Sequence, residues 1–162
     1  MPALKNCVWL NGQAEDAADF YVSVFPNSER GVTTRYLEGS PFPSPFQPGD
    51  VLTADFTLDG VPFQTLNGGP MFSPSEGVSF SISCADQAEV DYYWDALTAD
   101  GGQEQPCGWL KDKFGVSWQV VPMVVDEMTG SQDQAAALRA MQALMTMTRI
   151  DIAAMEAAFR GA

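Results

Sequence analysis

The chain has 162 residues, of which 46% are hydrophobic, enough to bury the core of one globular domain or of two small modules that share a core. Its 21 acidic and 8 basic residues give a net charge of −13, which repels phosphate backbones and anionic lipid headgroups and so argues against nucleic-acid or membrane-surface binding. Because the sequence contains no histidine, Ser-His-Asp and Cys-His nucleophilic systems and zinc sites built on imidazole are excluded.

The chain also lacks the marks of export or membrane insertion. No apolar run reaches the roughly 18 to 20 residues that cross a bilayer, and the stretch MPALKNCVWLNG has no signal-peptide core followed by a cleavage site. Cys7, Cys84 and Cys107 are spaced too widely and irregularly for a disulfide framework or a CxxC site. We therefore expect a soluble, cytoplasmic protein with reduced thiols.

The first half of the chain predicts a strand, a helix and further strands. Residues 6–10 form a short apolar run, and residues 14–25 have apolar side chains near helical spacing with acids in the first turn. Strands are predicted at 31–37, 51–58 and 62–66. The turn Asp59-Gly60 joins the last two strands as a hairpin.

A proline-rich loop at residues 39–50 separates two of these strands. Phe42 and Phe46 lie among four prolines, Pro41, Pro43, Pro45 and Pro48. This composition fits a semi-rigid flap that lays its phenylalanines over a pocket or across a dimer, and it fits equally a polyproline-like surface segment. The sequence leaves both interpretations open.

The same order of elements then begins again. Residues 78–84 alternate apolar side chains with serines, as in a strand with two different faces. Asp86 and Glu89 have the spacing of a capping box, which predicts a helix that continues through Leu97. Further strands are predicted at 107–110 and 116–121. The repeated order indicates two similar α+β modules in one domain, at about 4–70 and 76–122.

A helical tail is predicted at about 126–160. Apolar residues keep helical spacing along its middle, namely Ala135, Leu138, Met141, Leu144 and Met145, and Asp151 is placed to cap a last helix. We interpret the methionine stripe as core or dimer packing rather than as a cofactor site.

Five segments together resemble one known family: WLNGQAEDAADFYVSVFPNS, LNGGPMF, DQAEVDYYWDAL, CGWLKDKFGVSWQVVP and MTRIDIAAMEAAF. They are similar to the PhnB-like branch of the vicinal-oxygen-chelate superfamily, often labelled 3-demethylubiquinone 3-methyltransferase-like. The superfamily includes glyoxalase I, bleomycin-resistance proteins and extradiol dioxygenases. The resemblance covers nearly the whole chain and implies paired βαβββ modules, each curling a sheet around a cavity, with helices outside, in a homodimer.

The resemblance also implies where a metal would be bound. It aligns the ligand positions of metal-using relatives with Asn6, Gln64, Ser79 and Gln119. Those relatives carry His and Glu, whereas this chain carries three amides and a hydroxyl. Neutral oxygens alone do not offset the desolvation of a divalent cation, and transition metals prefer imidazole or thiolate. We therefore expect neither a metal nor another cofactor.

The methyltransferase label has no support in the glycine pattern. An S-adenosylmethionine site typically uses a glycine-rich turn between a strand and the start of a helix. Gly68-Gly69 is followed by Pro70 and more loop, and Gly101-Gly102 leads out of a helix. Neither pair has the expected context.

The predicted pocket is polar and uncharged. With Asn6, Gln64 and Gln119, the hydroxyls of Ser79 and Ser81 would offer donors and acceptors to a quinone-like or sugar-like ligand. The alternative is that the serines face bulk water. In this register Trp9 and Trp118 fall on the helix-facing side, and Asn67 satisfies a turn.

Trp109 and Lys111 precede the glycine turn at Gly115 and complete the predicted pocket. Lys111 could hold an anionic group or act as an acid or base, or it could pair at the surface with Asp112 or another acid. Two classes of function fit: a module that binds or sequesters a small organic molecule, and an enzyme, either the labelled methyltransferase or a metal-independent lyase or isomerase. The lack of titrating groups at the matched positions favours binding.

Overall fold

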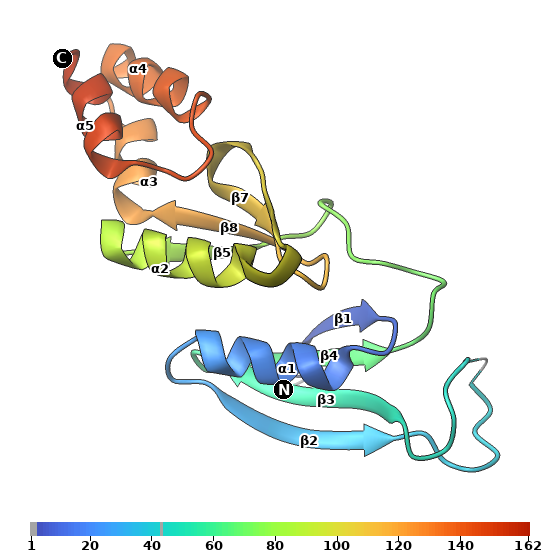
Figure 1. Cartoon of the computed structure of the whole chain (residues 1–162). Coiled ribbons are helices and arrows are strands. Elements are labelled where there is room, and N and C mark those ends of the chain that lie inside the picture. The colour runs from blue at the N-terminus through green and yellow to red at the C-terminus, as the bar shows by residue number, and fades with distance from the viewer. Residues whose placement is uncertain (1–2, 43) are drawn as a thin grey trace. The chain divides into compact units, whose positions relative to one another are not determined.

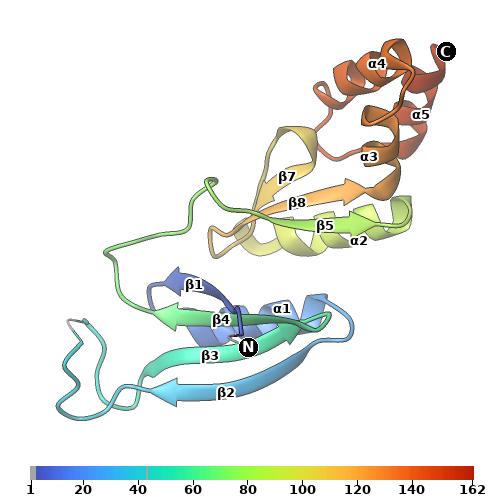
Figure 2. The same cartoon turned by 180° about the vertical axis from the view of Figure 1, so that it is seen from behind.

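The computed structural model describes residues 3–42 and 44–162. The chain divides into two compact units, Met1–Pro74 and Ser75–Ala162, and each unit contains its own four-stranded sheet. Figures 1 and 2 show the elements of both units from opposite sides. No helix in the described part of the chain is long and apolar enough to cross a bilayer.

The first unit is a sheet with one helix on one of its faces (Figure 1). Its elements are β1 (Asn6–Leu10), α1 (Ala14–Val24), β2 (Glu29–Arg35), β3 (Val51–Leu58) and β4 (Val61–Asn67). The strand order is β1-β4-β3-β2, in which β1 runs parallel to β4 and the other neighbours are antiparallel. Small buried residues of α1, Ala14, Ala17 and Ala18, allow the helix to approach β3 and β4 closely. Tyr21 stacks on Phe56, which stacks on Phe63.

Asn67 links three segments of the first unit. Its Oδ1 accepts hydrogen bonds from the amides of Gly12 (2.9 Å) and Ala14 (3.0 Å), and its Nδ2 donates to the carbonyl of Val51 (3.0 Å). The side chain is buried, at 3% exposure, so each of these backbone groups would otherwise lie away from water without a partner. The predicted structural role of Asn67 is confirmed, although it stabilises the turn that leads into α1 rather than its own turn.

The proline-rich loop packs in part against its own unit. Phe46 lies 5.6 Å from the ring of Tyr36, between centroids, and Pro45 approaches Gly69. Phe42 is 58% exposed. Pro43 lies outside the described residues.

The second unit repeats the first. Its elements are β5 (Phe80–Cys84), α2 (Gln87–Thr98), β6 (Gln103–Glu104), β7 (Trp109–Lys111) and β8 (Ser117–Pro122), with short 3-10 turns at Ala99–Gly101 and Pro106–Gly108. The strand order, β5-β8-β7-β6, matches that of the first sheet, again with the first and last strands parallel. The two βαβββ modules expected from the repeated pattern are therefore present. Asp86 caps α2 by accepting from the Glu89 amide (3.0 Å), and Glu89 accepts from Ala85, as the capping box predicts.

The turn between β7 and β8 is held by a buried carboxylate. Asp112 is 3% exposed and accepts from the amides of Phe114 (2.8 Å) and Val116 (3.1 Å) and from Nε1 of Trp118 (2.8 Å). Trp118 lies on the face toward α2 and is 2% exposed, so its predicted place in the core is confirmed.

Three helices form the tail: α3 (Met123–Thr129), α4 (Gln134–Leu144) and α5 (Ile152–Arg160). The tail begins directly after β8, earlier than predicted, and Asp151 caps α5 as expected, through the Ala154 amide (2.9 Å). Its buried cluster is made of Val125, Met128, Ala140, Ile150 and Met155, and Val121 of β8 packs against it.

Of the two packing roles expected for the methionine stripe, core packing is wrong for Leu138, Met141 and Met145, and dimer packing stays a prediction. Leu138, Met141 and Met145 are 55%, 42% and 71% exposed, and the buried residues of this helix are Ala136, Ala137 and Ala140. Alanines around the helix made the apolar periodicity fit more than one face, and the face with the smallest side chains is the one that packs.

Replacing Asn67 with alanine should lower the free energy of unfolding by about 2–4 kcal/mol, because two amides and a carbonyl lose a buried partner. Urea unfolding would measure the change. Asn11→Ala, at an exposed position beside Gly12, is the control and should cost less than about 0.5 kcal/mol. Equal losses in the two variants would contradict the role of Asn67.

Candidate functional site

Each sheet has one face covered by α1 or α2 and an opposite face, which neither of these helices covers and which we call the helix-free face; in the second sheet Val121 on this face packs against the tail. In the second sheet α2 covers the side that carries Ile82, Cys84, Leu110, Trp118 and Val120, and the alternating residues point the other way. The serines of β5 and the polar residues of β8 therefore share the helix-free face. Ser81 and Ser83 are exposed there, and Ser79 is half-buried.

Gln119 is the centre of this face. It pairs in register with Ser81 on one side and with Trp109 on the other, so the three side chains form one row across β5, β8 and β7. Its Nε2 donates to Oγ of Ser79 at 2.9 Å. We call these four residues the Gln119 row: Ser79, Ser81, Trp109 and Gln119. Four of the predicted pocket residues are thus brought together.

Lys111 lies on the same face but is already paired. Its Nζ is 2.5 Å from Oε1 of Glu76, and the hydrogen bond from Lys111 is the main cause that lowers the pKa of Glu76 below its usual value. Of the two interpretations of Lys111, pairing with a neighbouring acid is the one observed, with Glu76 rather than Asp112 as the partner.

Ser117 lies opposite Lys111 in the sheet and two residues before Gln119. It is 1% exposed, and its Oγ has no hydrogen-bond partner among the described residues. A buried hydroxyl without a partner costs about 1–3 kcal/mol. No local pattern singled out this serine, because its burial depends on the surrounding fold.

In the first sheet the helix-free face carries a chain of polar contacts around Gln64. Its Nε2 donates to Oδ1 of Asp55 (2.6 Å), whose Oδ2 accepts from Nζ of Lys5 (2.6 Å). Cys7 lies on the other side of Gln64, with Sγ 3.8 Å from Oε1. Asp55 was not among the predicted site residues, although the alternation Thr53, Asp55, Thr57 along β3 placed it on the polar side.

The predicted face of Asn6 is wrong, and so is that of Trp9. Asn6 lies on the helix-covered face with the buried Val8 and Leu10, and its Nδ2 donates to the carbonyl of Pro62 (3.3 Å). Cys7, not Asn6, pairs with Gln64. A shift of one residue exchanges the two faces of a strand, and β1 has apolar residues on both, so its own pattern does not define the register.

Trp9 explains the glycine pair at the end of β4. Its Nε1 donates to the carbonyl of Gly69 (2.8 Å), and Phe72 meets its ring edge to face at 5.0 Å. A Cβ atom on Gly68 would lie 2.2 Å from the indole. Gly68-Gly69 therefore makes room for a tryptophan and does not form a phosphate-binding turn.

The ionisable groups near Gln64 perturb one another. Partial burial opposes ionisation of Asp55, but the hydrogen bonds from Lys5 and Gln64 outweigh it and lower its pKa. Desolvation raises the pKa of the Cys7 thiol, with Lys5 opposing and Asp55 adding to the shift.

Burial, aided by Glu89 and Asp86, raises the pKa of Cys84 to about 12. All three cysteines are free thiols.

The side chains present do not fit a divalent metal. No group of three or more His, Cys, Asp or Glu within residues 3–42 and 44–162 is arranged to hold one. Asp55, the carboxylate beside Gln64, is already occupied by Lys5 and Gln64. An S-adenosylmethionine site of the usual kind is not formed either, because neither glycine pair precedes the start of a helix.

Comparisons with known proteins agree with this architecture. The family model for 3-demethylubiquinone-9 3-methyltransferase matches residues 2–121. A PhnB protein from Bacillus cereus is 30% identical over 75% of this chain and 99% of its own, with a TM-score of 0.65. A Pseudomonas aeruginosa protein is 20% identical over 75% and 98% of the two chains, with a TM-score of 0.61.

The fosfomycin resistance protein FosX from Listeria monocytogenes shares the fold at 14% identity, covering 78% of this chain and 94% of its own, with a TM-score of 0.53. No curated protein sequence matches the chain. The family model ends at residue 121, so the three tail helices lie outside it.

Asp55→Asn should destabilise the protein by about 1 kcal/mol at neutral pH, since the Lys5–Asp55 pair is partly exposed. The pKa of Asp55 is lowered by folding, so its contribution is present above the unfolded carboxyl pKa of about 3.9 and is lost as the pH falls through the folded value. Urea unfolding of both proteins between neutral and acidic pH measures this. A difference that stays constant into strong acid would refute the assignment.

Proposed function

Since the chain belongs to the 3-demethylubiquinone-9 3-methyltransferase family, in the PhnB-like branch of the vicinal-oxygen-chelate superfamily, we propose that it binds a small, neutral, polar organic molecule without a metal or other cofactor. The family name suggests methyl transfer, and the side chains on the helix-free faces suggest recognition. The proposal therefore depends on what those side chains can do chemically.

The observation that carries the proposal is the Gln119 row. The amide of Gln119 and the hydroxyls of Ser79 and Ser81 can each donate and accept, which suits carbonyl and hydroxyl groups of a ligand. Trp109 adds a flat apolar surface beside them. The row contains no charge, and the nearby Lys111 is paired with Glu76, so a neutral ligand is favoured over an ion.

Ser117 supports the same interpretation. Its buried hydroxyl lies on the Gln119 side of β8 and has no partner in the described residues, so a ligand group that bonds to it would recover the energy that the unpaired hydroxyl costs. A site that contains one such hydroxyl discriminates against ligands that cannot reach it.

The same row argues for binding without reaction. General acid–base catalysis needs a titrating group within hydrogen-bond reach of the substrate, and the members of the Gln119 row do not titrate near neutral pH. We propose capture or sequestration as the function. Methyl transfer, or a metal-independent lyase or isomerase activity, is the alternative that the family name favours.

Thermal-shift assays with quinones, sugars and glycopeptide antibiotics would test this, with S-adenosylmethionine and divalent metals as the competing probes. A neutral ligand at about 100 times its Kd should stabilise the native state by about 2.7 kcal/mol. Gln119→Ala should abolish the shift, because it removes the centre of the row. Ser83→Ala, on the same face but outside the row, is the control and should keep it. Stabilisation by S-adenosylmethionine or by a metal instead would overturn the proposal.

We also propose that the chain forms one vicinal-oxygen-chelate domain with its tail, assembles as a homodimer and acts in the cytoplasm, as the superfamily resemblance implies. Light scattering after gel filtration should give twice the chain mass of 17.5 kDa at micromolar concentration. A mass of 17.5 kDa would contradict the homodimer.

A further inference from the structure

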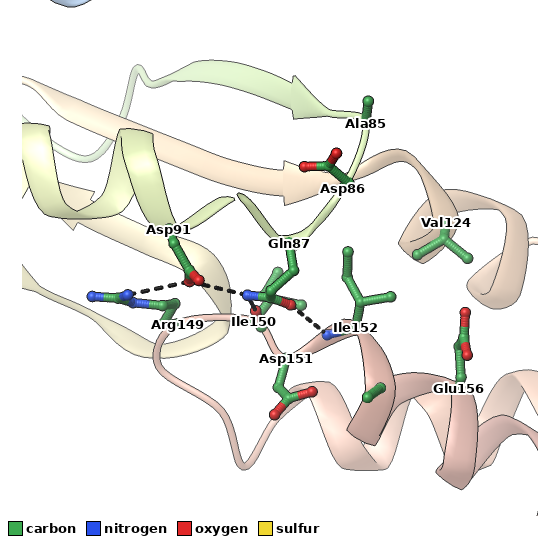
Figure 3. A pocket seen from close by; sticks show the side chains of 11 residues that line it. Ala85, Asp86, Gln87, Asp91, Val124, Arg149, Ile150, Asp151, Ile152 and Glu156 are labelled. Carbon is green, nitrogen blue, oxygen red and sulfur yellow. Dashed lines mark hydrogen bonds and ion pairs between the residues drawn. The ribbon is translucent and has the colours of Figure 1, made fainter. Parts of the chain in front are cut away.

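A groove of about 720 Å³ lies in the second unit, away from the Gln119 row. Its walls come from the start of α2, from α3, from α5 and from the segment 145–151 that precedes α5 (Figure 3). None of the four residues of the Gln119 row lines it. The volume is in the range of sites for small molecules. Most of its walls lie beyond residue 121, so the groove is formed by the tail together with α2.

Hydrogen bonds hold the walls in place. Gln87 donates through Nε2 to the carbonyl of Ile150 (3.1 Å) and to Oδ1 of Asp91 (3.1 Å), and its Oε1 accepts from the amide of Ile152 (2.9 Å), as Figure 3 shows. Arg149 forms ion pairs with Asp91 (3.2 Å) and Asp95. These contacts tie α2 to the start of α5, so the groove exists before any ligand binds.

The charge of the lining favours a cation. Four carboxylates line the groove, and two cations pair with members of this set, Arg149 with Asp91 (3.2 Å) and Arg160, outside the lining, with Glu156 (3.4 Å), so negative charge remains in excess. The carboxylates are Asp86, Asp91, Asp151 and Glu156. In Figure 3, Val124 and Ile152 lie between Asp86 and Glu156.

An anion would find few free donors at the two helix starts. The amide of Glu89 is taken by Asp86, that of Ala154 by Asp151 and that of Ile152 by Gln87. The positive ends of α2 and α5 are therefore already matched by acceptors from the chain.

The other lining residues indicate which kind of cation would fit. These residues are aliphatic: Ala85, Val124, Ile150, Ile152 and Ala153. A bare metal ion does not suit it, because no acidic group of three in the described residues could hold one. An alkyl chain would be stabilised by burying apolar surface on these residues. A second copy of the chain has few cationic side chains to place in this groove, with 8 basic residues against 21 acidic ones.

We propose that this groove binds a small aliphatic amine, with its ammonium group at the carboxylates of the lining and its alkyl chain on Val124 and Ile152. The site is independent of the Gln119 row and does not require the function proposed for that row.

The test is an NMR titration of the full chain with hexylamine, with hexan-1-ol and hexanoate as neutral and anionic probes of the same length. Hexylamine should give saturable amide shifts at residues 85–91 and 149–156, with a Kd of about 1 mM or lower that rises with salt. The alcohol and the carboxylate should not saturate. Gln119→Ala should bind hexylamine unchanged, which separates this site from the first.

Matched variants distinguish the groove from general charge attraction. The double variant Asp86→Asn/Glu156→Gln removes two charges from the groove, and asparagine caps a helix as well as aspartate does. This double variant should raise the Kd for hexylamine by about tenfold or more. Asp126→Asn with Glu127→Gln removes two exposed charges of α3 outside the groove and should leave the Kd within about twofold.

Three results would overturn the proposal: no saturation by hexylamine below about 10 mM, equal weakening in both pairs of variants, or saturable binding of hexanol with the same Kd. Circular dichroism would verify that both pairs of variants are folded. If the groove pair were unfolded, Glu156→Gln alone, at a surface position of α5, provides the same comparison against Glu127→Gln.

Discussion

In each module the first strand pairs in parallel with the last, β1 with β4 and β5 with β8. A strand presents alternate residues to opposite faces, so the partner and register of β1 and β5 determine which side chains lie under the helix. In the second module the pairing of β5 with β8 puts Ser81 beside Gln119 and leaves Ile82 and Val120 under α2. In the first it puts Cys7 beside Gln64.

Polar side chains have different roles on the two faces of each sheet. Under or near the helices, polar groups are used for structure: Asn67 holds the turn into α1, and Asp112 holds the turn into β8. On the helix-free faces the amides of Gln64 and Gln119 instead contact other side chains, through Asp55 and Ser79. Gln119 is therefore the residue on which the proposed recognition centres, and the buried Ser117, whose hydroxyl has no partner among the described residues, lies two positions before it.

The tail changes the second module in two ways. Its buried cluster packs against Val121, so it covers one end of the sheet. It also adds the groove beside α2, where carboxylates outnumber cations and the floor is aliphatic. The two sites differ in chemistry: the Gln119 row is neutral and hydrogen-bonding, and the groove is acidic and apolar.

Local patterns in the sequence were enough to determine the elements and their repetition. Alternation in 78–84, the capping box at Asp86 and the hairpin at Asp59-Gly60 depend on neighbours within a few residues. The structure has the capping box and the hairpin, whereas the strand begins only at Phe80 and Val78 is 69% exposed. The faces of short strands were not determined in this way. β1 is apolar on both sides, so only its pairing with β4, more than fifty residues away, could place Cys7 and Trp9 on the helix-free face and Asn6 on the helix-covered face. The burial of Ser117, the pairing of Lys111 with Glu76 and the groove at Gln87 likewise required the tertiary structure, because each depends on groups that are distant in the sequence and meet only in the folded chain.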